Sequence, residues 1–246
     1  MKGKIYISLI AVKHSAILFF ILIFVMSRDD FIIDDLKRDI IYYFKKQYDL
    51  GMLNSFEGNI TVRIPDSENF LVTPTQQDKE KITPEMILEV DKNGNLVEES
   101  QWKPSSELGM HLKIYELRPD IQAVVHNHST YATAFALVGR PISNEMAEGY
   151  MFYGGDIPVC PYGRPGTPAV YAHFEKYFVD KDKDVVLLAN HGLVAAGKSV
   201  SQAFSKAEAV EKLAKIVIAS EALGPDLPLS SVEKEKLLEV YKARKD

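Results

Sequence analysis

The chain has 246 residues, of which 46% are hydrophobic, which is enough for one well-buried domain and marginal for two. Its net charge is −5 and its lysines and arginines are scattered, which excludes the basic footprint of a nucleic-acid-binding protein. The single cysteine, Cys160, excludes an internal disulfide and suits a reducing compartment, and we interpret it as a buried, inert thiol.

The first 25 residues differ from the rest of the chain. They are almost wholly apolar from Ile5 to Val25 and follow two lysines, a pattern typical of a signal sequence or a membrane anchor. However, Lys13 and His14 lie in the middle of the run, where charge is costly in a membrane, and no small-residue cleavage site follows. We therefore interpret residues 1–25 as a start-site artefact, with an uncleaved anchor as the alternative. We expect residues 26–246 to form one cytoplasmic domain.

The first predicted element of that domain is an amphipathic helix at residues 29–48, which ends at Gly51. Its apolar positions recur at intervals of three and four residues, at Ile33, Leu36, Ile40, Phe44 and Tyr48. Residues 60–64 alternate between apolar and polar and predict a strand, and residues 70–74 predict a second strand that pairs with it.

The remaining elements are delimited by prolines, glycines and capping residues, such as the Ser230-x-x-Glu233 capping box. In chain order we first predict a short helix from Thr83, a hairpin at Asn93-Gly94 and a helix from Ser105 that ends before Pro119. A strand at 123–128, a helix at 130–138, a strand at 157–159 and a helix at 167–179 follow. The last elements are a strand at 184–189, continued by 193–196 past Gly192, a helix at 201–223 and a helix from Ser230. This mixture predicts a single three-layer α/β/α domain around a mixed, largely antiparallel sheet.

Two histidines lie at the end of the strand at 123–128, in the sequence Val125-His126-Asn127-His128. Residues two apart on a strand point to the same face, so His126 and His128 present two imidazoles side by side. A lone His-x-His is a weak signal for a metal, but His191 also follows an apolar strand and precedes a glycine. We therefore predict that His126, His128 and His191 bind one divalent metal ion.

Glu107 is expected one turn into the helix that ends just before the histidine strand. By itself it would be a glutamate that complements the helix dipole, but beside a metal it is a candidate general base. His111 lies one turn further on, and we expect it to steady Glu107 or to pack.

A second group of polar residues lies at turns that are adjacent to the predicted strands and helix. Gly58 and Asn59 precede one strand, Thr73 and Thr75 end the next, and Ser105 and Ser106 lie at a helix N-terminus, which favours anions. Each is an ordinary turn by itself. Together their amides and hydroxyls could bind a phosphate without a conspicuous basic residue.

The order and spacing of these motifs resemble the class II aldolase/adducin family over roughly residues 30 to 240. The similar segments are Gly58-Asn59-Ile60-Thr61-Val62-Arg63, Val72-Thr73-Pro74-Thr75, Pro104-Ser105-Ser106-Glu107, Arg118-Pro119-Asp120, Ala123 to His128, and Asn190-His191-Gly192. The resemblance implies Zn²⁺ on His126, His128 and His191, and Glu107 as the acid/base that also contacts the metal when substrate is absent. It implies phosphate binding by Gly58, Asn59, Thr73, Thr75, Ser105 and Ser106, and a homotetramer with active sites between subunits.

The implied reaction is reversible cleavage of a ketose 1-phosphate, such as L-fuculose 1-phosphate, to dihydroxyacetone phosphate and an aldehyde. A sugar-phosphate 4-epimerase, a dehydratase, a decarboxylase and a non-catalytic adducin-like binding domain are the alternatives. The sequence departs from the aldolase pattern at Gln76, where glycine is frequent, and it has no clear counterpart of a tyrosine that a neighbouring subunit supplies. Tyr150 and Tyr153 are the nearest candidates.

Overall fold

The computed structural model describes residues 28–143, 145–180 and 182–244. The expectation for residues 1–25 lies outside these residues. Within them, no helix is both long enough and apolar enough to cross a membrane.

A seven-stranded sheet forms the middle of the domain, in the order β3-β2-β1-β4-β7-β6-β5. The β5–β6 pair is parallel and the other neighbouring pairs are antiparallel, which confirms the predicted mixed, largely antiparallel sheet. The strands are β1 (Asn59–Arg63), β2 (Phe70–Val72), β3 (Leu88–Val90), β4 (Ala123–Asn127), β5 (Val159–Cys160), β6 (Val185–Leu188) and β7 (Gly192–Gly197).

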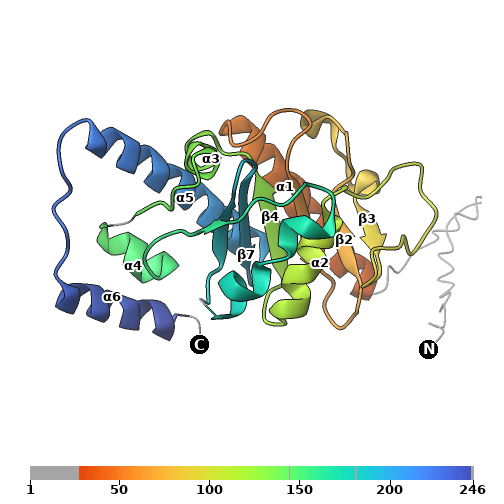
Figure 1. The fold of residues 1–246 in the computed structure, drawn as a ribbon. Coiled ribbons are helices and arrows are strands. Elements are labelled where there is room, and N and C mark those ends of the chain that lie inside the picture. Colours follow the sequence, from red (N-terminus) through yellow and green to blue (C-terminus); the bar gives the residue numbers. More distant parts are fainter. Residues whose placement is uncertain (1–27, 144, 181, 245–246) are drawn as a thin grey trace, which may run out of the picture.

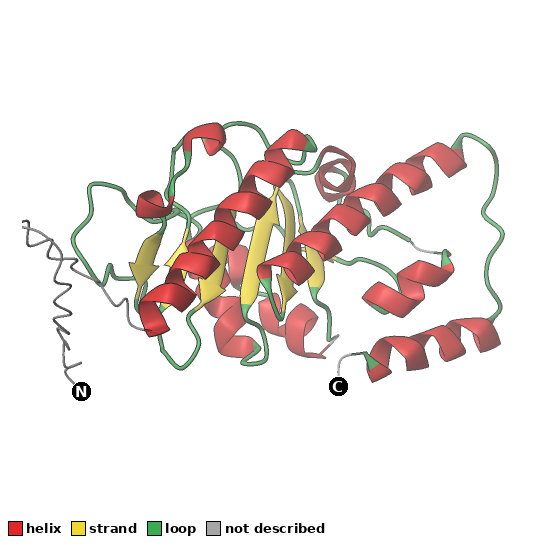
Figure 2. Ribbon diagram, turned by 180° about the vertical axis from the view of Figure 1, so that it is seen from behind, coloured by secondary structure: helices red, strands yellow, loops and turns green. Residues whose placement is uncertain are grey.

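Helices cover both faces of this sheet, as the predicted three-layer arrangement requires. Figure 2 shows α1 (Arg28–Asp49) and α5 (Val200–Glu221) across one face, where they pack with α3 (Thr130–Leu137) on an apolar core that includes Phe44 and Phe204. The opposite face is covered by α2 (Leu108–Leu117), the 3₁₀-helix η3 (Pro168–Tyr171) and the π-helix η4 (Glu175–Asp180). Each helix buries one apolar stripe against the sheet, which is the main source of stability for such a layer.

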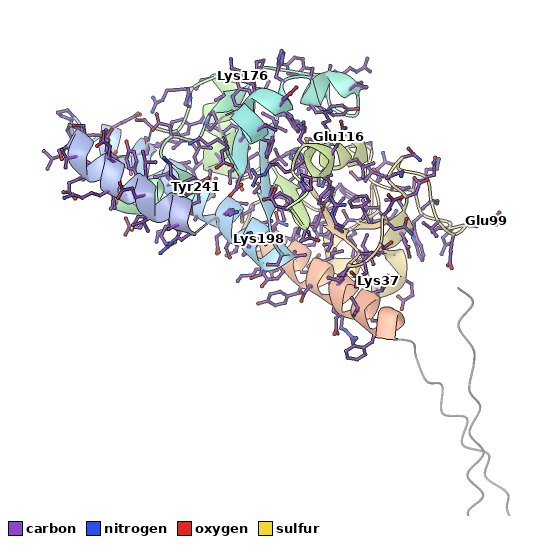
Figure 3. All side chains as sticks on the ribbon, turned by 90° about the horizontal axis from the view of Figure 1, so that it is seen from below. Lys37, Glu99, Glu116, Lys176, Lys198 and Tyr241 are labelled. Atoms are coloured by element: carbon purple, nitrogen blue, oxygen red, sulfur yellow. The ribbon has the colours of Figure 1, made fainter. Side chains whose placement is uncertain are left out.

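Two further helices lie beside this body and pack on each other, α4 (Ala147–Tyr153) and α6 (Ser231–Ala243) (Figure 1). Tyr241 of α6, labelled in Figure 3, is buried, and its hydroxyl donates to the carbonyl oxygen of Asp182 at 3.1 Å. Ser230 caps α6 as predicted, because its Oγ accepts a hydrogen bond from the amide of Glu233, whereas the carboxylate of Glu233 pairs with Lys236 instead of completing the capping box.

Several predicted elements are wrong in extent. Residues 193–196 do not continue the preceding strand, because the chain reverses at Asn190, in a left-handed conformation (φ 57°), and returns as the antiparallel strand β7. The single helix predicted at 167–179 is divided into η3 and η4, and Val170 of η3 and Phe174, directly before η4, pack in the core on this face of the sheet. The helix from Thr83 is only the 3₁₀-helix η2 (Pro84–Met86), and the hairpin at Asn93-Gly94 has a single bridge, from Val90 to Leu96, instead of a second strand.

Candidate active site

His126 belongs to β4, in the middle of the sheet between β1 and β7, and its side chain is fully buried. Its Nδ1 lies 2.8 Å from the carbonyl oxygen of Leu193. Since a carbonyl oxygen can only accept, Nδ1 carries a proton, and in the neutral ring Nε2 has the lone pair that a metal could use. The strand pairing therefore fixes both the orientation and the tautomer of this imidazole.

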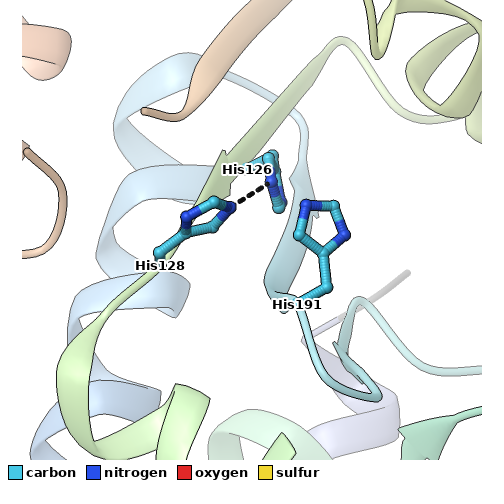
Figure 4. A group of neighbouring side chains, drawn as sticks. All are labelled: His126, His128 and His191. Carbon is cyan, nitrogen blue, oxygen red and sulfur yellow. Dashed lines mark hydrogen bonds between the residues drawn. The ribbon is translucent and has the colours of Figure 1, made fainter. Parts of the chain in front are cut away.

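The other two histidines lie where the C-terminal end of β4 meets the start of β7 (Figure 4). His128 follows β4, and its Nε2 is 3.1 Å from Nε2 of His126. His191 lies in the tight turn that enters β7, and its ring centroid is 4.7 Å from that of His126 and 5.0 Å from that of His128. One nitrogen from each ring lies within 4.8 Å of the others, so the three could hold one metal ion.

The close approach of β4 and β7 at this point depends on Gly192. A Cβ atom on Gly192 would lie 2.5 Å from the carbonyl oxygen of Asn127 and 2.7 Å from Cδ2 of His128. Any other residue would therefore push the two strands apart where the three imidazoles meet.

Glu107 lies directly before α2, which begins at Leu108, and not one turn inside the helix as predicted. Its amide donates to Ser105 Oγ, so the serine forms the turn that leads into the helix. This position brings Oε1 to 3.2 Å from Nε2 of His191 and Oε2 to 3.2 Å from Nε2 of His126. The predicted base and the predicted ligands thus meet in one cluster, although they come from distant parts of the sequence.

The electrostatics of the cluster fit a cation. Burial opposes ionisation of Glu107, but contacts with His126 and His191 outweigh it and hold the pKa of the carboxyl well below its usual range. Burial, together with His126 and His191, lowers the pKa of His128 to about 4, so that imidazole is neutral, as a metal ligand must be. Burial alone would lower the pKa of His126, but the Glu107 carboxylate raises it.

One buried oxygen in the cluster also suits a metal. Among the described residues, Glu107 Oε1 has no hydrogen-bond partner, and it lies 3.2 Å from Nε2 of His191. A carboxylate facing three imidazoles is a donor set that zinc and similar divalent ions accept. The residues present therefore fit the divalent metal predicted from the sequence.

His111 packs below this cluster instead of steadying Glu107. It is fully buried, and its Nδ1 lies 2.8 Å from the hydroxyl of Thr61, which in turn contacts the hydroxyl of Tyr115 at 2.9 Å. Burial lowers the pKa of His111 to about 3, so the ring is neutral. Of the two roles considered for His111, packing is the one that these contacts support.

Five of the six predicted phosphate residues line one pocket of about 160 Å³ beside the histidines: Gly58, Asn59, Thr75, Ser105 and Ser106. The sixth, Thr73, does not line it. Thr73 is fully buried, and its hydroxyl accepts a hydrogen bond from the amide of Ile60 at 3.1 Å. This bond links the end of β2 to β1. Tyr150 and Tyr153 do not line this pocket either; they belong to α4, which lies beside the body of the domain.

Two charged residues of the pocket were missed from the sequence, Glu57 and Lys79. Glu57 Oε1 lies 3.4 Å from Nδ1 of His128, on the side of the ring opposite to His126. Lys79 is in the first position of the 3₁₀-helix η1 (Lys79–Lys81) and is 1% exposed. A Lys-Glu-Lys run usually lies on the surface, so nothing in this pattern indicates that its first lysine is buried.

Comparison with known proteins agrees with this geometry. The sequence model of the class II aldolase and adducin N-terminal domain matches residues 38–218. The chain is 36% identical over 211 residues to an L-fuculose phosphate aldolase of Escherichia coli O6:H1, a match that covers 84% of this chain and 94% of the relative. It is also 34% identical over 173 residues to a 3-oxo-tetronate 4-phosphate decarboxylase of Haemophilus influenzae, covering 69% of this chain and 80% of the relative.

A solved structure gives the same result at the level of the fold. The structure of an L-fuculose 1-phosphate aldolase superposes with a TM-score of 0.78 at 33% identity, covering 85% of this chain and 96% of that chain. The similarity therefore covers most of this chain and nearly all of that one.

Proposed function

This chain belongs to the class II aldolase and adducin family, and we propose that it is a metal-dependent aldolase acting on a ketose 1-phosphate. It would reversibly cleave a substrate such as L-fuculose 1-phosphate to dihydroxyacetone phosphate and an aldehyde. The observation that carries the proposal is the cluster of Glu107 with His126, His128 and His191 beside a small polar pocket. An L-fuculose phosphate aldolase that is 36% identical over most of both chains supports the same reaction.

In this proposal the three histidines hold one divalent ion, Zn²⁺, through their Nε2 atoms. The ion would act as a Lewis acid that polarises the substrate carbonyl and stabilises the negative charge left when the carbon-carbon bond breaks. The carbonyl oxygen of Leu193 accepts a hydrogen bond from Nδ1 of His126 and so orients the ring for metal binding through Nε2. The lowered pKa of His128 keeps its ring neutral, so this imidazole can also donate a lone pair to the ion.

Glu107 is the proposed acid/base. Its carboxylate is 12% exposed and is steadied by the side-chain amide of Asn59, which donates to Oε2 at 3.1 Å. From there it would exchange the proton at C3 of the ketose, the carbon that gains negative charge when its bond to C4 breaks. Its contacts with His126 and His191 favour the ionised form, which is the form able to accept this proton.

The polar pocket is the proposed site of the substrate phosphate. Hydroxyls of Thr75, Ser105 and Ser106 and the backbone at Gly58 and Asn59 line it beside the Glu107 cluster. Gly58 has φ +71°, and a Cβ there would lie 2.9 Å from the carbonyl oxygen of His126, so only glycine lets the pocket wall approach β4 this closely. Phosphate binding here would place the carbonyl end of the substrate near the histidines.

We further propose a homotetramer with active sites at subunit interfaces and a cytoplasmic location. Large apolar side chains are exposed on α4 and on the segment between α5 and α6, among them Phe152 and Leu223 at 43% and 90% exposure. Surfaces of this kind commonly become buried between subunits.

Decarboxylation is the second candidate reaction, because a 3-oxo-tetronate 4-phosphate decarboxylase is 34% identical over 173 residues. The same groups could stabilise the charge left by loss of CO₂. An epimerase and a dehydratase stay open for the same reason, whereas an adducin-like binding domain would have no need of the three histidines. A panel of sugar phosphates, assayed for dihydroxyacetone phosphate and for CO₂ in parallel, distinguishes aldol cleavage, which releases no CO₂, from decarboxylation, and an epimerase or a dehydratase would release neither product.

A further inference from the structure

Lys79 is a buried lysine in the wall of the proposed phosphate pocket. Its ammonium donates to the carbonyl oxygen of Gln77 at 3.1 Å and lies 4.6 Å from the centre of the Phe44 ring. Its own amide donates to the carbonyl oxygen of Ser55 at 3.2 Å, so the backbone at this position is also fixed. The charge is therefore held in place on a rigid part of the chain.

This ammonium forms no ion pair with any carboxylate of the described residues. Asp78, its neighbour in sequence, pairs instead with Lys81 at 3.0 Å. Lysines are almost never fully buried without a partner, because removing the charge from water is costly. Burial accordingly lowers the pKa of Lys79 to about 8, although the carboxylates of Asp78 and Glu57 favour its charged form.

Apart from Lys79, the charged side chains of the pocket are acidic. Its fixed charges besides Lys79 are the carboxylates of Glu57 and Glu107, and its hydroxyl and amide groups are neutral. A phosphate monoester carries close to two negative charges at neutral pH. Lys79 is the residue of the pocket wall that can compensate this charge, and two of its three N–H groups remain after the bond to Gln77.

We infer that Lys79 binds the phosphate of the substrate and makes this pocket selective for phosphorylated over unphosphorylated sugars. The inference rests on the proposed function for the identity of the substrate, but the charge requirement applies to any phosphate monoester in this pocket. A purely structural role, in which Lys79 only holds the 77–79 turn against Phe44, is the alternative.

The test uses the zinc-loaded full chain and glycerol 1-phosphate, a phosphate monoester that an aldolase cannot cleave. Lys79→Met keeps the unbranched aliphatic contact with Phe44 and removes the charge. Lys81→Met is the matched control, since Lys81 lies two residues further on the same short helix and its side chain is 81% exposed. Calorimetric titration gives the dissociation constant, and thermal melting confirms that each variant is folded.

Loss of one hydrogen bond to a charged group typically weakens affinity by about 10- to 100-fold. We expect Lys79→Met to weaken glycerol 1-phosphate binding by that factor, and Lys81→Met to leave it within about twofold. For a ketose 1-phosphate that the enzyme cleaves, the same variant should raise KM and leave kcat nearly unchanged. A folded Lys79→Met protein that binds glycerol 1-phosphate as tightly as the wild type overturns the inference.

A crystal structure of the wild-type protein with glycerol 1-phosphate does not depend on a variant folding. The inference requires Lys79 Nζ to lie within hydrogen-bond distance of a phosphate oxygen, about 3.2 Å or less. A phosphate bound out of reach of Nζ, or a wild-type protein that does not bind glycerol 1-phosphate, contradicts it. A protein that binds this probe through Lys79 but cleaves no ketose 1-phosphate would instead refute the proposed function alone.

Discussion

The carboxylate of Glu107 lies 3.2 Å from the imidazole of His126, measured from Oε2 to Nε2. The two residues are held by different parts of the fold: the turn before α2 positions the glutamate, and β4 in the middle of the sheet positions the histidine. Their contact places a group able to transfer a proton beside a group able to bind a metal. The first two predictions separate these two roles.

Glu107→Gln should give a folded protein that retains its metal and loses turnover by roughly 10² to 10⁴, the usual worth of a positioned acid/base. The amide keeps the size of the side chain but cannot accept the proton. Glu116→Gln, on the exposed side of α2, the helix that follows Glu107 (Figure 3), is the control and should have normal turnover. If Glu107 only complements the helix dipole, its replacement would change stability by about 0.3 to 1 kcal/mol and leave turnover normal.

Replacing any one of His126, His128 and His191 with alanine should abolish stoichiometric metal binding, because a site with three protein ligands loses a third of its donors. His173 is exposed and lies outside the cluster, so His173→Ala should bind metal normally. Metal content is measured by atomic emission on dialysed protein. Full occupancy in His191→Ala would refute the three-ligand site.

Gly192→Ala should weaken metal binding and lower the free energy of unfolding by about 1 to 3 kcal/mol, the usual cost of overpacking a closely packed site. The reason is the contact of 2.5 Å that the new Cβ would make with the carbonyl oxygen of Asn127. Gly109→Ala is the control, because its Cβ would make only an ordinary contact of 3.4 Å with Tyr171. Urea denaturation and zinc titration measure the two effects, and equal stability of the two variants would contradict the prediction.

Because Lys79 is buried, we expect the free energy of unfolding to depend on pH. Burial lowers the pKa of Lys79 from 10.5 to about 8, so between about pH 8 and 10.5 the unfolded chain binds more protons than the folded chain. The contribution of Lys79 to the free energy of unfolding must therefore rise with pH across this window. Urea denaturation of metal-free wild type and Lys79→Met should show a stability difference that shifts in favour of the wild type from pH 8 to 10. A difference that is constant over this range would show that Lys79 titrates normally.

The strand-borne part of the site could be predicted from the sequence because strand geometry is local. Two histidines two residues apart at a strand end must share a face, and His126 and His128 do. His191 could be grouped with them only as a hypothesis, since the sequence does not say that β7 pairs with β4. The reversal at Asn190 was missed, although asparagine followed two residues later by glycine is a frequent turn signal.

Other features depend on tertiary packing and have no local signal. The seven-residue helix α4 contains Gly149, lacks a side-chain cap, and gains its stability by packing on α6. The burial of Lys79 depends on Phe44 of α1, which is distant in sequence. The distance between Glu107 and the histidines likewise follows from how α2 packs on the sheet. The sequence could name Glu107 as a candidate base near a metal, and the family resemblance implied that it also contacts the metal.

The most direct test of the account is release of dihydroxyacetone phosphate from L-fuculose 1-phosphate and related ketose 1-phosphates, followed by a coupled reductase assay on protein of known metal content. We predict release by the zinc-loaded protein, loss of release after chelation, and recovery on adding one equivalent of Zn²⁺ per chain. Equal activity of the metal-free protein would contradict the account. So would a metal-loaded protein that liberates CO₂ from 3-oxo-tetronate 4-phosphate and yields no dihydroxyacetone phosphate from any ketose 1-phosphate.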